Sequence, residues 1–146
     1  MNRPEIKNTR QYIGACALLL NSQNQVLLGK RKNNYKAGYY GLPGGHIELN
    51  EPIAKAIKRE VAEETGLQLS NLDYVGVVRE NQDEHDFIHF VFVAQNVIHI
   101  PVLMEPEKCE GWEWVALNEI DEKILPGHLA AINIFQQQKT MSDLTE

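Results

Sequence analysis

Residues 12–21 limit the possible folds of this chain more than any other segment, because they are apolar on both faces of an extended strand. One face would carry Ile13, Ala15, Ala17 and Leu19, and the other would carry Cys16, Leu18 and Leu20. A strand of this kind is buried from both sides. We therefore expect it to lie centrally in a sheet that is covered on both faces.

Turn-forming residues divide the next part of the chain. Residues 26–31 form a second apolar run, and the polar residues 22–25 predict a hairpin turn between the two runs. The glycine-rich segment 41–45 is expected to be irregular, and a helix over residues 52–65 is expected to follow it. The predicted N-cap of this helix is Asn50 or Glu51, with Pro52 in the first turn and Gly66 as the closing residue.

The remaining patterns predict further strands and a closing helix. The strands are expected over residues 74–79, 87–95, 97–103 and 112–115, with a helical turn over 118–122 and a helix over 127–138. The order βββαβββα predicts an α/β domain of the α+β kind, in which a mixed sheet is flanked by helices. We expect a single domain over residues 1–146, with a core of about 10–138 and a frayed tail beyond Lys139.

Composition excludes several classes of protein. The 146 residues are 43% hydrophobic and 23% charged, which is typical of a globular chain and not of a disordered or collagen-like one. The longest apolar run, residues 15–20, is far shorter than the ~20 residues that cross a bilayer, and residues 1–11 lack the apolar segment of a signal peptide. We therefore expect a cytoplasmic protein. Its two cysteines offer neither a disulfide framework nor a CxxC metal site, so a metal would be bound by oxygen or imidazole.

Charge is unevenly distributed along the chain. Residues 1–36 carry seven basic residues and one acidic residue, although the whole chain has a net charge of −6. A nucleic-acid-binding surface is one interpretation, but such domains are usually strongly basic. A small anionic ligand, held by a few basic side chains and a cation, fits an acidic protein better.

Three glutamates of the predicted helix share one side of it. At about 100° per residue, Glu60, Glu63 and Glu64 fall within an arc of about 100° that borders the apolar stripe. Like charges at this spacing, near the negative end of a helix dipole, cost about 0.2–1 kcal/mol each. A divalent cation would reverse both effects, and carboxylates without paired His or Cys favour Mg²⁺ or Mn²⁺ over Zn²⁺. The alternative is an ordinary amphipathic helix whose Lys58 and Arg59 neutralise the glutamates.

These glutamates belong to a longer pattern. It runs from Gly45 through five residues to Glu51, and then through seven residues to Arg59-Glu60-Val61-Ala62-Glu63-Glu64-Thr65-Gly66-Leu67. The pattern resembles the signature of the Nudix hydrolase family without a departure. The resemblance implies a Nudix-type α/β/α sandwich. It also implies an enzyme that cleaves a diphosphate linked to a further moiety through attack of a metal-activated water at phosphorus.

Matching positions imply roles for individual residues. Glu60, Glu63 and Glu64 would hold Mg²⁺, with Mn²⁺ as a possible substitute, and the backbone carbonyl of Gly45 is a further candidate ligand. Glu60 and Glu63 are the catalytic candidates, since Glu63 is also able to orient or deprotonate the attacking water.

Other motif residues match structural positions. Glu51 and Arg59 correspond to the pair that ties the loop to the helix, and Gly66 closes the helix.

Candidates outside the helix are less specific. Arg31 resembles a basic residue that family members use on a phosphate, whereas solvated surface charge is about as good an explanation for Lys30. His46 is a candidate substrate contact, although a lone His in a loop is more often an ordinary hydrogen-bonding residue. Glu107 and Glu110 are alternative candidates for an extra metal ligand or base, because the family often uses a downstream acidic loop in this way.

Four further residues receive structural explanations. His85 and His89 would share one side of a strand, and we assign them no role. Trp112 and Trp114 would also share one face, where core packing is the better explanation, although Trp112 next to Gly111 could line a pocket.

A narrower resemblance concerns the substrate. The segments 42–48 and 105–114 look like the branch of MutT homologues that contains the vertebrate nucleotide triphosphate diphosphatases. It implies a (deoxy)nucleoside triphosphate that is cleaved to monophosphate and pyrophosphate. The alternatives are hydrolysis of ADP-ribose, another nucleotide sugar or a dinucleoside polyphosphate, and, in another class, an inert Nudix-fold module that binds nucleotides. We expect no membrane or nucleic-acid polymer as a partner, and a homodimer is possible.

Overall fold

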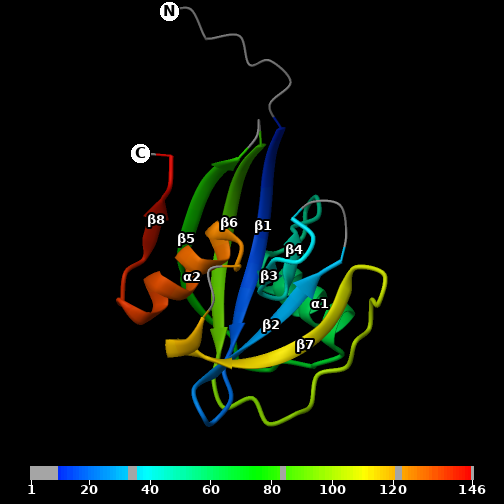
Figure 1. Cartoon of the computed structure of the whole chain (residues 1–146). Coiled ribbons are helices and arrows are strands. Elements are labelled where there is room, and N and C mark those ends of the chain that lie inside the picture. The colour runs from blue at the N-terminus through cyan, green and yellow to red at the C-terminus, as the bar shows by residue number, and fades with distance from the viewer. Residues whose placement is uncertain (1–9, 33–35, 83–84, 121–122, 146) are drawn as a thin grey trace, which may run out of the picture.

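A computed structural model describes residues 10–32, 36–82, 85–120 and 123–145 of the chain. These residues contain two β-sheets and two α-helices (Figure 1). In chain order the elements are β1 (Arg10–Leu19), β2 (Gln25–Arg31), β3 (Tyr40–Gly41), β4 (Gly44–His46), α1 (Ile53–Thr65), β5 (Asp73–Gln82), β6 (His85–Ala94), β7 (Cys109–Ala116), the 3₁₀ turn η1 (Leu117–Glu119), α2 (Pro126–Gln136) and β8 (Met141–Asp143). The larger sheet has the order β4-β1-β6-β5-β8, and the smaller has the order β3-β2-β7. The predicted class, a mixed sheet flanked by helices, is confirmed.

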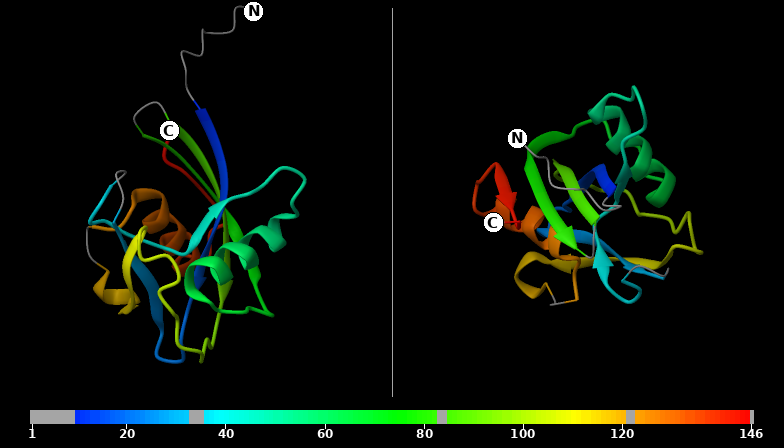
Figure 2. Two further views of the ribbon diagram at one scale, coloured as in Figure 1. Left: turned by 90° about the vertical axis from the view of Figure 1, so that its right-hand side faces the viewer. Right: turned by 90° about the horizontal axis from the view of Figure 1, so that it is seen from above.

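Strand β1 lies inside the larger sheet, as its two apolar faces predict. It runs parallel to β6 and antiparallel to β4. Leu18 and its neighbours on one face pack against buried residues of α2, whereas Ala17 and its neighbours on the other face pack against Ile57 and Val61 of α1. The two helices therefore cover opposite faces of the sheet (Figure 2). This burial on both sides holds for residues 14–19, which are apolar, whereas Arg10, Gln11 and Ile13 at the start of the strand are exposed.

The predicted hairpin turn is present, but its two strands part into different sheets. The side-chain Oδ1 of Asn21 accepts hydrogen bonds from the backbone N–H groups of Gln23 and Gln25, each at 3.0 Å. Leu20 and Val26 then form an isolated antiparallel bridge. Beyond this bridge, β2 pairs with β3 and β7 instead of β1. The strands of the fold therefore form two sheets.

Helix α1 ends as predicted but begins differently. Gly66 adopts a φ of 74° and donates its N–H to the carbonyl of Ala62, which closes the helix. The N-cap is Pro52, which offers no side-chain hydrogen bond, so the prediction of Asn50 or Glu51 as the cap is wrong. The physical reason is that the Glu51 carboxylate is already bonded to the Arg59 side chain.

Most of the later elements lie where the sequence placed them. The strands predicted over residues 74–79 and 87–95 are β5 and β6, which pair antiparallel. The strand predicted over 112–115 is β7, and the helix predicted over 127–138 is α2. The turn predicted over 118–122 is η1, although residues 121–122 lie outside the described part of the chain.

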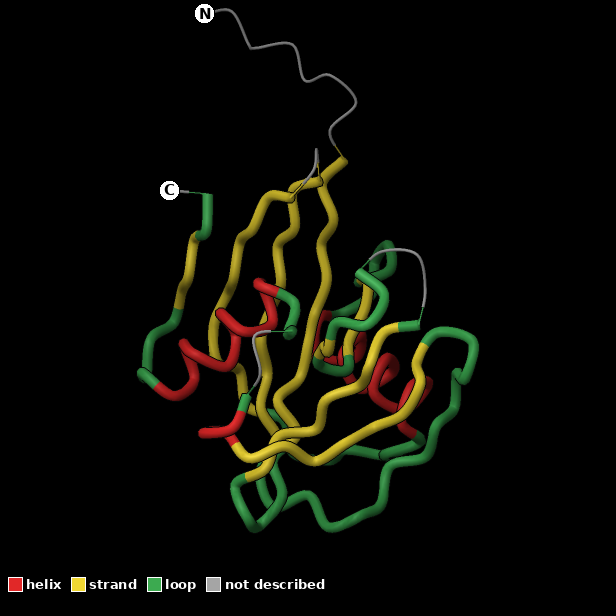
Figure 3. Tube along the Cα trace, in the orientation of Figure 1, coloured by secondary structure: helices red, strands yellow, loops and turns green. Residues whose placement is uncertain are grey.

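Two predictions about the later part of the chain are wrong. Residues 97–103 form no strand but belong to a long loop (Figure 3), because Pro101 lacks an N–H and the Val97 and Val102 N–H groups bond to the ends of β1 and α1. The tail beyond Lys139 is not frayed up to residue 145. It forms β8, which pairs parallel with β5, and the N–H of Leu144 donates to the Arg79 carbonyl at 2.8 Å.

Neither helix in these described ranges is long and apolar enough to cross a membrane.

Burial of β1 on both faces leads to a stability prediction. Leu18 is fully buried, so Leu18→Ala is expected to lower the free energy of unfolding by about 2–5 kcal/mol in a denaturant titration. The matched control is Leu49→Ala, since Leu49 is 93% exposed and its truncation is expected to change stability by less than about 0.5 kcal/mol. Equal losses in the two variants would contradict the assignment of β1 to the core.

Candidate active site

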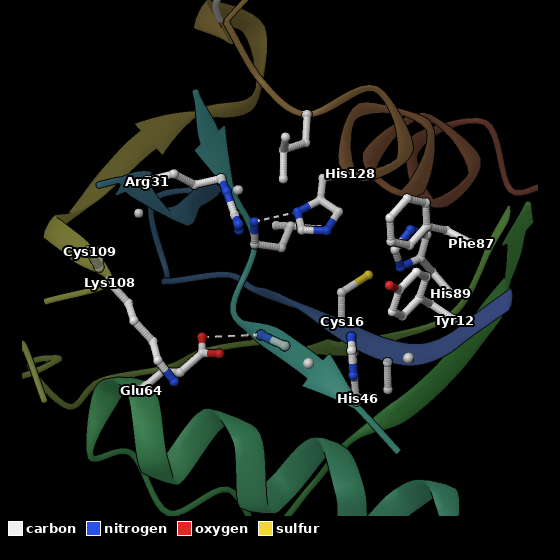
Figure 4. A pocket seen from close by; sticks show the side chains of 18 of the residues that line it. Tyr12, Cys16, Arg31, His46, Glu64, Phe87, His89, Lys108, Cys109 and His128 are labelled. Carbon is white, nitrogen blue, oxygen red and sulfur yellow. Dashed lines mark hydrogen bonds between the residues drawn. The ribbon is translucent and has the colours of Figure 1, made fainter. Parts of the chain in front are cut away.

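A cavity of about 290 Å³ opens beside β4 (Figure 4). Strands β1, β2, β3, β5 and β6, the end of α1, the loop before β7, β7 itself and the start of α2 contribute the rest of its wall. Four of the residues predicted from the sequence line this cavity, namely Arg31, Gly45, His46 and Glu64. Figure 4 shows Glu64 and Lys108 on one side of it and a group of aromatic side chains on the other.

The two glycines of β4 allow this strand to fit between β1 and α1. A Cβ at Gly44 would collide with the Ala15 carbonyl of β1, and a Cβ at Gly45 would collide with the Glu60 carboxylate of α1. The N–H of Gly44 donates to Oε2 of Glu64 at 3.3 Å. The glycine pair therefore brings two of the predicted metal ligands, Glu60 and Glu64, against one short strand.

Glu64 is the most perturbed carboxylate at the site. Its pKa is raised to about 8, first by its burial and then by the nearby carboxylates of Glu60 and Glu105. The hydrogen bond from the Gly44 N–H and the charge of Lys108 act in the opposite direction. A buried acid next to other acids is stabilised in its charged form by a nearby cation.

Arg59 forms hydrogen bonds with several carboxylates on the acidic side of the helix. It bonds Glu51 at 2.7 and 2.9 Å, Glu60 at 2.9 Å and Glu63 at 3.3 Å, and it also donates to the His46 carbonyl at 3.1 Å. The Arg59 hydrogen bond, followed by the Glu48 N–H, lowers the pKa of Glu51 to about 2. The structure thus forms the tie between loop and helix that the motif implies.

The donor set fits a divalent cation, although no preformed cage of three acidic, His or Cys side chains exists within the described ranges. The Arg59 guanidinium pairs with four carboxylates, and Glu64 adds a fifth close by. The contact between Gly45 and the Glu60 carboxylate leaves no space for a Cβ at position 45. Excess carboxylate charge of this kind, offered by oxygen ligands alone, suits Mg²⁺ or Mn²⁺.

The acidic loop before β7 differs from the prediction. Neither Glu107 nor Glu110 lines the cavity, whereas Glu105 does. The Glu110 carboxylate instead pairs with Lys30 at 3.4 Å. Glu105 is therefore the carboxylate of this loop that is placed to act as the extra metal ligand or base, the role that we predicted for Glu107 or Glu110.

Arg31 and His46 are two of the four predicted residues on the wall. Arg31 ends β2 and lines the cavity together with Lys30. His46 ends β4, and its ring lies 5.3 Å from that of Tyr12. Trp112 also lines the cavity, and its indole N–H donates to the Glu64 carbonyl at 3.1 Å, which fixes the end of α1 against β7.

The aromatic side of the cavity was missed from the sequence. The rings of Tyr12, Phe87 and His89 form a stacked row, with neighbouring centroids 5.2 and 5.8 Å apart. His89 also contacts the buried Glu80, with 3.1 Å between Nε2 and Oε1. His128 completes this side, since its ring lies edge-on to His89 at 5.5 Å.

His128 is held in one protonation state. Its Nδ1 accepts a hydrogen bond from the Leu42 N–H at 2.8 Å, and burial together with the charges of His89 and Arg31 lowers its pKa to about 3. Nearby, burial raises the pKa of the Cys16 thiol to about 12. Alternation along β6 could have suggested that Phe87 and His89 share a face, but no local pattern joins them to Glu80 or His128.

Comparison with known proteins identifies several relatives. The profile of the NUDIX domain matches residues 10–138. The putative 8-oxo-dGTP diphosphatase of Bacillus subtilis is 27% identical over 126 residues, which cover 84% of this chain and 78% of that protein. The ADP-ribose pyrophosphatase of Methanocaldococcus jannaschii is 37% identical over 70 residues, which are 46% of this chain but 41% of that protein. This chain thus matches less than half of the length of the archaeal enzyme.

The fold agrees with these matches. The crystal structure of the MutT NUDIX hydrolase from Burkholderia pseudomallei superposes with a TM-score of 0.79 at 28% identity, over 85% of this chain and 97% of that one.

Burial of Glu64 leads to a prediction about pH. In the unfolded chain this carboxyl titrates near 4.5, and in the folded chain it titrates near 8, so the folded state binds the extra proton between these values. Its contribution to stability is therefore complete below about pH 4.5 and is lost as the pH rises to 8. In EDTA, Glu64→Gln is expected to unfold with a shallower decline between pH 5 and 8 and to be more stable than the wild type at pH 8 by at least about 1 kcal/mol. Glu119→Gln, which alters an exposed carboxylate, should keep the wild-type decline, and the same decline in Glu64→Gln would refute the assignment.

The ion pairs of Arg59 lead to a second prediction. Arg59→Ala removes the tie between the loop and α1 and leaves several carboxylates without a counter-charge, so we expect the melting temperature to fall by roughly 5 °C. Lys58→Ala is the control, because Lys58 is an exposed neighbour on the same helix. An equal, small shift in both variants in a thermal denaturation experiment would show that Arg59 does not hold the loop.

Proposed function

The chain belongs to the Nudix hydrolase family, and we propose that it hydrolyses a nucleoside triphosphate to the monophosphate and pyrophosphate with the help of Mg²⁺. Members of this family generally use divalent metal ions. A relative that matches 84% of this chain is a putative 8-oxo-dGTP diphosphatase, which supports a triphosphate as the substrate class.

The observation that carries the proposal is the division of one cavity into two chemically different sides. Glu64, Lys108 and Arg31 lie on its polar wall, and Tyr12 and Phe87 lie on its aromatic wall. A nucleotide has the same division, with anionic phosphates at one end and a planar ring at the other. Aromatic side chains bind such rings by stacking, and basic side chains bind phosphates.

The cation would be held by Glu60, Glu64 and the carbonyl of Gly45, which the packing of β4 on α1 brings together. When bound, Mg²⁺ would neutralise phosphate oxygens and lower the pKa of a coordinated water.

The side chains supply the remaining requirements. Arg31 and Lys108 would hold the phosphate oxygens on the cavity wall, where their charges also favour the developing negative charge. Glu63, which Arg59 orients at 3.3 Å, would accept a proton from the attacking water. The water oxygen forms a new bond to phosphorus as the anhydride P–O bond breaks, and the pyrophosphate leaves with the bonding electrons.

A nucleotide sugar such as ADP-ribose is the competing substrate. The ADP-ribose pyrophosphatase among the relatives matches only 46% of this chain, which is why we favour a triphosphate. The same cation site would serve either substrate, because it acts on the diphosphate that both contain.

The proposal predicts the behaviour of two conservative variants. Glu60→Gln and Glu64→Gln each remove a charged metal ligand without changing its shape, so we expect turnover of nucleoside triphosphates to fall by at least about a hundredfold. Chromatographic separation of the products, with and without EDTA, gives the measurement. Glu119→Gln serves as the control, because its exposed side chain lies away from the cavity wall.

The same assay distinguishes the alternatives. Metal-dependent release of monophosphate and pyrophosphate from a triphosphate supports the proposal. Exclusive formation of AMP and ribose phosphate from ADP-ribose would contradict it, as would unchanged turnover in both variants.

A further inference from the structure

A buried carboxylate stands on the aromatic side of the cavity with one oxygen unused. Glu80 is 8% exposed and lines the cavity. Its Oε1 contacts Nε2 of His89 at 3.1 Å, whereas its Oε2 is buried and has no hydrogen-bond partner among the described residues. An unpartnered carboxylate oxygen in such a place costs free energy unless a donor reaches it. A ligand in the cavity is a source of such a donor.

A fixed donor lies next to this carboxylate. The Leu42 N–H can only donate, so Nδ1 of His128 must be an acceptor, and the proton of the neutral ring is therefore on Nε2. His128 lines the same cavity, and the residue before it, Gly127, lies directly against the Glu80 carboxylate. The wall thus offers one N–H donor beside a group that only accepts.

The Nε2–H of His128 is one donor, and the two Glu80 oxygens are two acceptors, since Oε1 keeps a second lone pair beside its contact with His89. This set of one donor and two acceptors is selective among nucleobases. The Watson–Crick edge of guanine presents the complementary set, which is a carbonyl oxygen, a ring N–H and an amino group. Adenine and cytosine instead present a ring nitrogen lone pair beside the amino group, and a carboxylate repels that lone pair. Hypoxanthine keeps the carbonyl and the ring N–H of guanine but lacks the amino group.

We propose that Glu80 and His128 are the specificity-determining residues of the cavity and that they select a guanine ring by its Watson–Crick edge. Glu80 accepts from the ring N–H and the amino group, and the Nε2–H of His128 donates to the carbonyl oxygen. The row of Tyr12, Phe87 and His89 supplies the apolar, aromatic wall beside the ring. This inference rests on the proposed function in placing a nucleotide in the cavity, and it adds the identity of the base.

The first test compares nucleoside monophosphates, because their binding requires neither metal nor hydrolysis. Calorimetric titration of the wild-type protein in EDTA with GMP, IMP, AMP and CMP is expected to show GMP binding at least about tenfold tighter than each of the others. Comparable affinities for GMP and AMP, or no GMP binding at millimolar concentration, would overturn the proposal. Either result would leave triphosphate hydrolysis intact, so the two proposals fail separately.

A conservative variant tests Glu80 itself. Glu80→Gln replaces one acceptor by an amide donor, which opposes the guanine amino group and complements the edge of adenine. We expect GMP affinity to fall at least about tenfold and the ratio of GMP to AMP affinity to approach or pass one. Asp73→Asn removes an exposed carboxylate from the same strand and is expected to keep the wild-type order. An unchanged order in a folded Glu80→Gln protein would exclude Glu80 as the selecting residue, and the wild-type series above decides the question if this variant does not fold.

Discussion

Strand β4 packs between β1 and helix α1 so closely that neither Gly44 nor Gly45 leaves room for a side chain. This close approach positions the Glu60 and Glu64 carboxylates against the strand, and it depends in turn on β1, whose opposite faces are buried by α1 and α2. The acidic helix is therefore located by the core and not by interactions among the acids, which repel one another. The geometry of the site follows from that of the hydrophobic packing.

The cavity has a polar side and an aromatic side, and different interactions hold the side chains of each in place. On the polar side, Arg59 organises the carboxylates by ion pairs, and the excess negative charge suits a divalent cation. On the aromatic side, order comes from burial, since Glu80, His89 and His128 are held by strand register and by a single backbone hydrogen bond from Leu42. In the proposed function, the first region would serve any diphosphate, whereas the second would depend on the ring attached to it.

The sequence predicted the elements whose signals are local. The two apolar faces of β1 and the closing Gly66 each lie within one segment, and the structure agrees with both. The spacing from Gly45 to Glu64 is also local, and the structure places the Glu64 carboxylate at the N–H of Gly44. The strand predicted over residues 97–103 is wrong because their apolar side chains imitate a strand, although these residues pair with no strand of either sheet in the described ranges. Glu105, Glu80 and His128 could not be selected from the sequence, because their approach to the cavity depends on the register of distant strands and on where α2 begins.

The proposed function depends above all on a divalent cation that binds where β4 meets α1. Paramagnetic broadening of amide NMR signals by substoichiometric Mn²⁺ tests this site most directly, since it locates the ion without any assay of turnover. We expect the amide signals of Gly44 and Gly45 to broaden first, while that of Met141 stays sharp, because β8 lies four strand positions from β4, or about 19 Å. Selective broadening centred on any other part of the chain would contradict this assignment.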